Sequence, residues 1–290
     1  MPIMSTCLII PVAQDEEEQD VALTVNSFKR LVPNATVIFG VDEDYANSWL
    51  SKYGSVVRVK GFGIGKALDS AVKEALKDNC EFIIKSDAHM YFVDFEYPLW
   101  LEVPYTCTMD GNCFGASTAK WPSMDWLFTY GQYHILPMTT EPVYAYPGVI
   151  AEIMNREFGC VYCSPYWGPE AYDFTLTACR RYGWCVRQAH WRVRHKYKKE
   201  WPKDRIQRNY PWEPWMAEYN AQPYFTSMSI AWQIFITRHV NNPRKHPRYN
   251  EYFYNIALKY YPDRMKYVNG YPVEFIYDKL GIPIEQRIGA

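Results

Sequence analysis

The sequence predicts an α/β fold, in which helices cover both faces of a largely parallel sheet. Short apolar runs of strand length alternate with segments of helical periodicity through the first part of the 290-residue chain. This alternation is typical of parallel strands joined by crossover helices. Ligands of such sheets bind beyond the carboxyl ends of the strands, so the residues that follow the strands are the first candidates for a functional site.

Four strands are expected near the N-terminus, at residues 6–12, 35–41, 55–61 and 81–86. Helices are expected between them, at residues 15–31, 45–53 and 63–79, because their apolar residues recur on one helical face. Three residues stand at the carboxyl ends of these strands and should line one crevice: Pro11, Asp42 and Asp87.

The pattern is weaker beyond the fourth strand. Residues 97–148 are rich in Pro, Gly and aromatic residues, and we expect irregular structure there. A helix at 149–158, a loop that becomes a helix within 167–183, and a strand at 184–195 should follow. We therefore divide the chain into a domain at 1–200 and a basic, aromatic, helical C-terminal extension at 201–290.

Composition limits the compartment and the partners. No apolar run reaches ~18 residues, so no membrane-spanning helix is expected. The apolar CLIIPV has no basic residues before it and DEEEQD after it, which argues against a signal peptide. The eight cysteines include one CxxC, Cys160 and Cys163, with no second pair at zinc-ribbon spacing. We expect reduced thiols in a cytoplasmic protein, with zinc at the CxxC as the minor alternative.

The stretch EFIIKSDAHMYF, residues 81–92, places Asp87 and His89 at the end of the fourth strand. Residues two apart in an extended chain point to the same side. One carboxylate and one imidazole suit Mn²⁺ or another divalent ion, and leave coordination positions for a diphosphate. Taken alone, an Asp and a His at a strand end more often bind no metal.

Two further motifs follow in order. Trp167-Gly168-Pro169-Glu170 opens a predicted helix, and His195 ends the next predicted strand within RHKYK. With Asp87-Ala88-His89 they resemble three motifs of the glycosyltransferase A-type fold, a Rossmann-like mixed sheet flanked by helices. The closest likeness is to the polypeptide N-acetylgalactosaminyltransferases and related family 2 glycosyltransferases. It covers roughly residues 5–200.

The resemblance implies a UDP-sugar donor and Mn²⁺ or another divalent cation. The implied metal ligands are Asp87, His89 and His195. The residues implied for the nucleotide donor are Pro11, Val12, Ala13, Asp42, Lys66, Lys198 and Trp201. Those implied for the sugar or the acceptor are Gly148, Trp167, Gly168 and Glu170, with Glu170 and Asp87 as catalytic residues. A divalent ion and a lysine would stabilise the charge that gathers on the departing diphosphate.

One departure from the family bears on stereochemistry. Inverting family 2 enzymes carry a catalytic Asp directly after the Glu, and this chain has Ala171 there. Either Glu170 serves as the base or the enzyme retains configuration. We expect retention.

The acceptor is the most open question. Residues 1–195 carry a net charge of −7 and residues 196–290 a net charge of +6. One basic cluster, interleaved with aromatic residues, comprises Arg180, Arg181, Arg187, Arg192, Arg194, Lys196, Lys198, Lys199, Lys203, Arg205 and Arg208. A second comprises Arg238, His239, Arg244, Lys245, His246 and Arg248. Cations and aromatic rings together are typical of nucleic-acid channels.

We therefore expect an acceptor such as a hydroxymethylated pyrimidine in DNA, in the cytoplasm of a bacterium or a virus-infected host cell. Two alternatives remain open. The acceptor is a glycan, a lipid-linked sugar or a protein Ser/Thr, or the chain is a non-catalytic module that binds a nucleotide-sugar.

Overall fold

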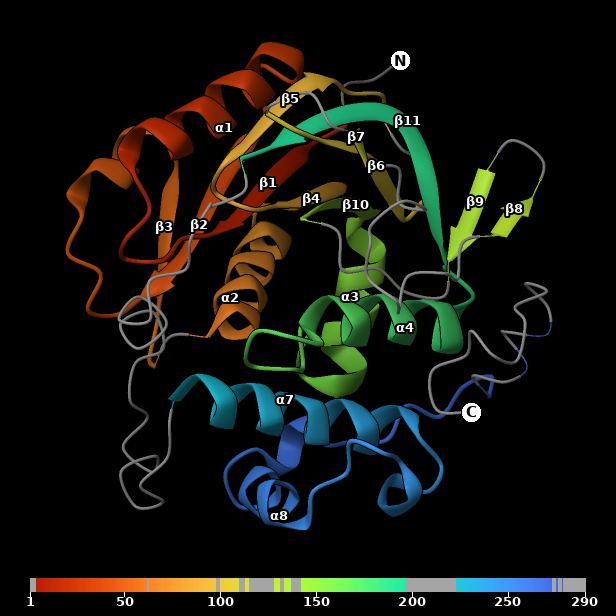
Figure 1. Ribbon diagram of the computed structural model, residues 1–290. Coiled ribbons are helices and arrows are strands. Elements are labelled where there is room, and N and C mark those ends of the chain that lie inside the picture. The colour runs from red at the N-terminus through yellow and green to blue at the C-terminus, as the bar shows by residue number, and fades with distance from the viewer. Residues whose placement is uncertain are drawn as a thin grey trace.

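The structure is a computed structural model. It describes residues 4–61, 63–97, 100–109, 113–114, 128–130, 133–136, 142–196 and 223–272, together with Phe275 and Asp278. A mixed sheet of 11 strands forms its centre, in the order β3-β2-β1-β4-β10-β6-β11-β9-β8. Off this path, β5 (Met90–Asp94) pairs with β11 (Val186–His195), and β7 pairs with β6. Helices lie on both faces of this sheet (Figure 1), as the sequence predicted.

The N-terminal half of the sheet is parallel. Its strands are β1 (Thr6–Pro11), β2 (Thr36–Asp42), β3 (Ser55–Val59) and β4 (Phe82–Ser86), joined through helices α1 (Glu18–Leu31) and α2 (Ile64–Lys77). Each lies where the sequence predicted an element of its type. The segment predicted as a helix at 45–53 is only the 3₁₀ turn η1 (Ser48–Lys52). Because the four strands run the same way, their carboxyl ends meet at one edge of the sheet.

The other half of the sheet is mixed, and here the sequence-based prediction is wrong. Residues 97–148 were expected to be irregular, yet they contribute strands β6 (Glu102–Thr108), β7 (Cys113–Phe114), β8 (Phe128–Tyr130), β9 (Tyr133–Leu136) and β10 (Val143–Pro147). Strand β10 runs antiparallel to β4 and β6. Most of β10 is completely buried, so it lacks the apolar–polar alternation that identifies a strand with one wet face.

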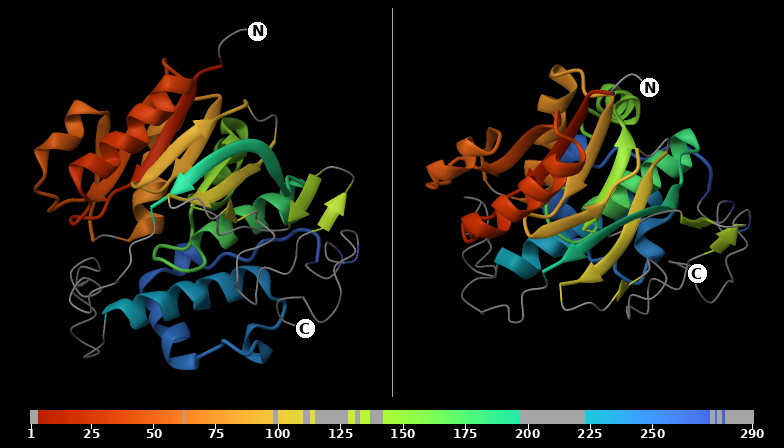
Figure 2. Two further views of the ribbon diagram at one scale, coloured as in Figure 1. Left: turned by 45° about the horizontal axis from the view of Figure 1, so that its top comes forward. Right: turned by 90° about the horizontal axis from the view of Figure 1, so that it is seen from above.

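Two apolar cores lie on opposite faces of the sheet because side chains alternate along each strand. Leu8 and Ile10 of β1 face α1, where they join the cluster that contains Val25 and Phe28. Cys7 and Ile9 face the opposite core, formed with α2, α3 (Gly148–Phe158) and α4 (Glu170–Tyr182). In Figure 1 the strands lie between α1 on one side and α2, α3 and α4 on the other, and the left view of Figure 2 shows them between α1, in red, and the blue helices near the C-terminus.

Beyond α3 and α4 lie α7 (Pro223–His239) and α8 (Glu251–Tyr260), the described helices of the predicted C-terminal extension (Figure 1). Tyr166 joins their apolar cluster with Ile230 and Ile256. Polar contacts also join α7 to α4, because the Asp173 carboxylate is 2.7 Å from both Arg238 Nε and His239 Nε2 with all three side chains buried. These helices are therefore packed onto the sheet domain through α4.

This packing corrects part of the expected basic surface. Arg238, His239 and Arg180 are almost completely buried, and Arg180 donates to the His239 carbonyl at 2.9 Å. Four more cations of the first cluster are paired with carboxylates: Arg181 with Glu157, Arg187 with Glu102, Arg192 with Asp94, and Lys196 with Asp20. The sequence-based expectation treated all these cations as available for binding. The buried carboxylates of Asp173, Glu102 and Asp20 instead neutralise Arg238, Arg187 and Lys196.

The cysteines also differ from expectation. Three pairs are joined as disulfides: Cys7–Cys80, Cys160–Cys163 and Cys179–Cys185. The expectation of reduced thiols is therefore wrong for these six residues, and Cys160 and Cys163 form no zinc site. Disulfides are rare in reducing compartments, so the pairs do not support the expected cytoplasmic location. Among the described helices, none is both long enough and apolar enough to cross a membrane.

Candidate functional site

Two chain segments, the β4–β5 connection and the end of β11, bring Asp87, His89 and His195 together at the carboxyl edge of the parallel strands. Asp87 follows β4 and His89 precedes β5 (Met90–Asp94), while His195 is the last residue of β11 (Val186–His195). Strands β5 and β11 pair antiparallel with His195 opposite Met90, and the Lys196 amide donates to the His89 carbonyl at 3.1 Å. This register holds the two histidines side by side.

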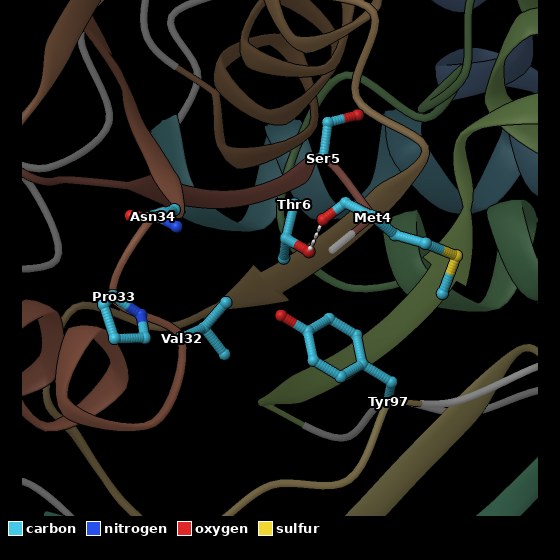
Figure 3. A pocket seen from close by; sticks show the side chains of 7 residues that line it. All are labelled: Met4, Ser5, Thr6, Val32, Pro33, Asn34 and Tyr97. Atoms are coloured by element: carbon cyan, nitrogen blue, oxygen red, sulfur yellow. Dashed lines mark hydrogen bonds between the residues drawn. The ribbon is translucent and has the colours of Figure 1, made fainter. Parts of the chain in front are cut away.

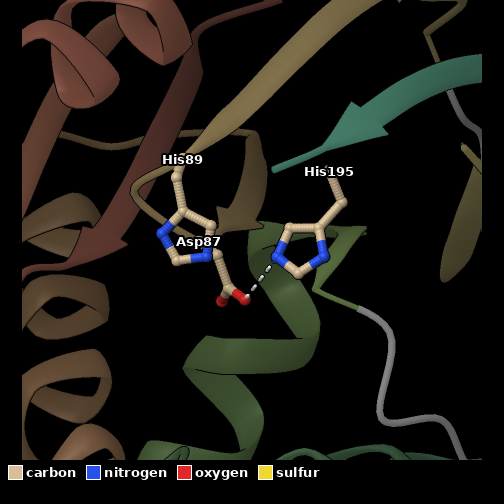
Figure 4. Close-up of side chains that lie close together, drawn as sticks. All are labelled: Asp87, His89 and His195. Carbon is tan, nitrogen blue, oxygen red and sulfur yellow. Dashed lines mark ion pairs between the residues drawn. The ribbon is translucent and has the colours of Figure 1, made fainter. Parts of the chain in front are cut away.

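The three side chains point toward one another (Figure 4). One ligand atom from each lies within 4.8 Å of the others, and His195 Nε2 is 3.8 Å from Asp87 Oδ2. Ligands about 2.1 Å from one ion are up to ~4.2 Å apart, so a small closure of these side chains would bring all three into coordination distance. The carboxylate and the two imidazoles thus fit a divalent ion such as Mn²⁺.

The electrostatics of both histidines suit metal binding. Burial lowers the pKa of His195 to about 4, although the Asp87 carboxylate opposes the shift, so this imidazole is neutral at pH 7. Neutral imidazole is the form that binds metals. His89 Nδ1 lies 3.3 Å from the Glu16 carboxylate, which leaves His89 Nε2 for an ion. A carboxylate behind a metal-binding histidine is a common arrangement that fixes the ring.

Asp87 is held from behind by Lys85. The Lys85 ammonium donates to Asp87 Oδ1 at 2.6 Å and to the Pro142 carbonyl at 2.9 Å. Burial acts to raise the pKa of Asp87, but the charge of Lys85, followed by the two imidazoles, outweighs it and the pKa lies below its ordinary value. Asp87 is therefore ionised at neutral pH.

Glu170 lies close enough to feel the charges of this centre. It is the first residue of α4, it is 7% exposed, and its carboxylate accepts the Gly168 N–H at 2.7 Å. Burial raises the pKa of Glu170 to about 7; backbone N–H groups and Lys85 oppose the rise, and Asp87 adds to it. A carboxyl group with a pKa near the working pH is suited to exchanging a proton or donating a hydrogen bond.

The residues expected around the nucleoside lie at the same edge of the sheet. Pro11 ends β1 and Asp42 ends the neighbouring β2, and the Val12 amide donates to the Gly40 carbonyl at 3.0 Å between them. Asp42 is 5% exposed and Ala13 half-buried. Pro11, Val12, Ala13 and Asp42 are thus neighbours, and their contact with a nucleoside stays a prediction.

The remaining expected residues fall into three groups. Trp167 and Gly168 lie in the turn directly before Glu170 and are therefore close to its carboxylate. Trp167 is partly exposed, and Gly168 has a φ of 129°. The Lys66 ammonium lies 5.3 Å from the Tyr166 ring centre and 5.8 Å from that of Tyr261, so it faces the C-terminal helices. Lys198 and Trp201 lie outside the described residues.

Gly148 is not brought to the site. It begins α3 at the opposite end of β4 from Asp87, where its amide donates to the Glu81 carbonyl at 2.8 Å. A Cβ there would be 2.1 Å from the Cys80 carbonyl oxygen, which explains the glycine by close packing. The expected substrate role of Gly148 is therefore replaced by a structural one.

A cavity of about 550 Å³ lies at the other end of β1 from Pro11 (Figure 3). It is lined by Met4, Ser5, Thr6, Val32, Pro33, Asn34 and Tyr97. The lining offers no titratable group besides a tyrosine, and it is separated from Asp87 by the length of the strands. This cavity has no part in the candidate site.

Sequence reasoning missed three residues that shape the centre: Lys85, Glu16 and Tyr144. Tyr144 is opposite Lys85 in the β10–β4 pair and its ring lies 5.8 Å from the Lys85 ammonium. Lys85 had a readable signal, since a lysine inside an apolar strand, two residues before an aspartate, points to the same side as that aspartate. Glu16 and Tyr144 had none, because only the tertiary fold brings them to the site.

Comparison with known proteins gives structural neighbours only. No known sequence family matches the chain, and no characterised protein is significantly similar in sequence. A crystal structure of GalNAc-T7 with UDP, GalNAc and Mn²⁺ matches with a TM-score of 0.55 and 14% identity, over 96% of this chain and 57% of that one. The chain thus spans just over half the length of that neighbour. S. aureus TarS 1–349 in complex with UDP-GlcNAc matches with a TM-score of 0.49 and 14% identity, over 81% of each chain.

Together with the strand order and the helices on both faces, the likeness to GalNAc-T7 shows that this chain has the glycosyltransferase A-type fold that its sequence predicted.

Proposed function

We propose that the protein is a metal-dependent glycosyltransferase that moves a sugar from a UDP-sugar to an acceptor hydroxyl. The observation that carries the proposal is the convergence of Asp87, His89 and His195 at the carboxyl edge of the sheet in this fold. That edge is where doubly wound sheets bind their ligands. The GalNAc-T7 neighbour was crystallised with UDP and Mn²⁺, which agrees with a donor and an ion of this kind.

Asp87, His89 and His195 would hold the divalent ion. Once bound, the ion stabilises the negative charge that develops on the departing UDP. Pro11, Val12, Ala13 and Asp42 border the nucleoside, and Lys198 and Trp201 belong to the segment proposed to close over the diphosphate. Lys66 remains a weaker candidate, because its ammonium is already placed over two tyrosine rings.

Glu170 is proposed to contact the transferred sugar or the acceptor hydroxyl, with Trp167 and Gly168 beside it. Its raised pKa suits a hydrogen-bond donor or a proton acceptor at neutral pH. Ala171 offers no carboxylate at the next position. We therefore propose transfer with retention, in which the acceptor proton leaves with the phosphate oxygen. The anomeric configuration of the product, read by NMR, tests this proposal.

For the acceptor we propose a hydroxymethylated pyrimidine in DNA. Fewer cations support this proposal than the sequence alone suggested. The burial of Arg238, His239 and Arg180 removes three of the expected cations. The support that remains is the exposed Arg194 beside His195, the basic tract of residues 198–208, and the exposed Arg244, Lys245 and Arg248 of the second cluster. A glycan, a lipid-linked sugar and a protein Ser/Thr are the other outcomes of the test.

The test is a screen of UDP-sugars with Mn²⁺ against hydroxymethylated DNA, unmodified DNA and a Ser/Thr peptide, read by the mass of the product. We expect transfer to one acceptor that is lost in Asp87→Ala and kept in Glu74→Gln, a control that changes a half-buried acid on α2 paired with Lys77. If the folded wild type showed no transfer and no UDP-sugar hydrolysis with any donor or acceptor in the screen, the non-catalytic binding module would be favoured.

A further inference from the structure

A buried lysine lies directly behind the candidate metal ligand. Lys85 is 4% exposed, on the penultimate residue of β4, with its ammonium 2.6 Å from Asp87 Oδ1. Burying a lysine is unfavourable unless its charge is paired and its N–H groups are bonded. The residues around Lys85 must therefore supply a counter-charge and hydrogen-bond acceptors for its ammonium.

The surroundings fix the position of the ammonium. The Pro142 carbonyl accepts from Lys85 Nζ at 2.9 Å and from the Asp87 amide at 3.0 Å, so one carbonyl holds both residues. The Tyr144 ring, whose residue pairs with Lys85 across the β4–β10 ladder, lies 5.8 Å from the ammonium. The Lys85 ammonium is thus held by hydrogen bonds to Asp87 and Pro142 and by its contact with the Tyr144 ring.

The two oxygens of Asp87 consequently have different partners. Oδ1 is bonded to Lys85, whereas Oδ2 faces His195 Nε2 at 3.8 Å. An ion between the two histidines and Asp87 would meet Oδ2, because Oδ1 is already engaged by a cation.

We propose that Lys85 is a positioning residue that makes Asp87 a one-oxygen ligand and thereby selects the ion that the centre binds. The proposal rests on the metal site proposed above. Ions such as Mg²⁺ take one oxygen from a carboxylate in a compact octahedral shell, and Mn²⁺ prefers similar ligands. Ca²⁺ takes more oxygens and accepts both atoms of a carboxylate. Holding Oδ1 on Lys85 therefore disfavours Ca²⁺ relative to Mn²⁺.

The test compares the two ions in one ratio. Mn²⁺ binding to the full chain without donor is measured by the EPR signal of free Mn²⁺, and Ca²⁺ binding by competition. The charge of Lys85 repels both dications alike, so it cancels in the ratio of their Kd values. In Lys85→Met, Oδ1 becomes available to the ion, and we expect the preference for Mn²⁺ over Ca²⁺ to fall about tenfold, a size typical of residues that orient metal ligands.

Two variants separate this role from a merely structural one. Lys85→Arg keeps a cation on Oδ1 and should keep most of the preference. Lys73→Met also removes an ammonium from a buried carboxylate, that of Asp69, but on α2 away from the site, and should leave the ratio unchanged. Ca²⁺ competing no better in a folded Lys85→Met than in the wild type would overturn the proposal. If Asp87→Ala bound Mn²⁺ as tightly as the wild type, the metal site itself would be wrong.

Discussion

The imidazole rings of His89 and His195 stack with their centroids 5.0 Å apart and their planes at 29°. The antiparallel pairing of β5 with β11 brings the two rings together, because His195 lies opposite Met90, the residue that follows His89. Two imidazoles on paired strands, with Asp87 beside them, form a half-shell of ligands that no single segment of the chain contains.

Removing His195 should weaken Mn²⁺ binding to the protein alone by more than about 100-fold, since even residues behind metal ligands contribute 10–100-fold. Calorimetric titration of His195→Ala measures the loss. Glu74→Gln, which changes a half-buried acid on α2 paired with Lys77, should bind like the wild type. Equal affinities of His195→Ala and the wild type would exclude this histidine as a ligand.

Glu170 should make stability depend on pH. Its folded pKa of about 7 is above the ordinary 4.5, so between these values the unfolded chain has lost the proton and the folded chain keeps it. The contribution of the protonated Glu170 carboxyl to the free energy of unfolding is fully present below pH 4.5. It falls by roughly 3 kcal/mol as the pH rises through 7. Glu170→Gln should lack this fall.

Urea denaturation of both proteins at pH 5 and pH 8 checks the sign. We expect Glu170→Gln to gain stability relative to the wild type at the higher pH. A difference between the two proteins that does not change with pH would mean that the Glu170 carboxyl is not buried in the folded protein.

Asp173 should be essential to the attachment of α7. Arg238 and His239 hold the pKa of this carboxyl at about 2, against the effect of burial. Breaking such a buried pair leaves Arg238 without its counter-charge, so Asp173→Asn should reduce the free energy of unfolding by about 3–5 kcal/mol.

The matched control is Glu251→Gln, which breaks an exposed pair with Arg244 and should change stability by less than about 1 kcal/mol. Urea denaturation measures both variants. Similar midpoints for the two would show that the buried pair does not hold the helices together.

Arg194 should matter for binding if the acceptor is DNA. It is exposed on β11, while its neighbour Arg192 on the same face is paired with Asp94. A phosphate contact by Arg194 predicts weaker binding of hydroxymethylated DNA in Arg194→Ala, with a salt slope smaller by about 1. Arg192→Ala should show a smaller loss. Affinity that does not vary with salt, or no binding at all, would count against a DNA acceptor.

The sequence predicted the parts of this structure that local patterns encode. Strand β4, the opening of α4 at Glu170 and the end of β11 at His195 lie where the motifs indicated. Strand β10 was missed because it is buried on both faces and shows no alternation. The burial of Arg238 was missed because a lysine or arginine in a helix is normally solvated, and only the position of Asp173 across the α4–α7 contact shows otherwise.

The central claim is that one divalent ion, held by Asp87, His89 and His195, engages the diphosphate of the donor. A crystal grown with Mn²⁺ and UDP tests it most directly through the anomalous signal of manganese. The account predicts one peak about 2.1–2.3 Å from Asp87 Oδ2 and from a nitrogen of each histidine, in contact with the UDP phosphates. A peak elsewhere, or UDP bound with His195 turned away from Asp87, would contradict it.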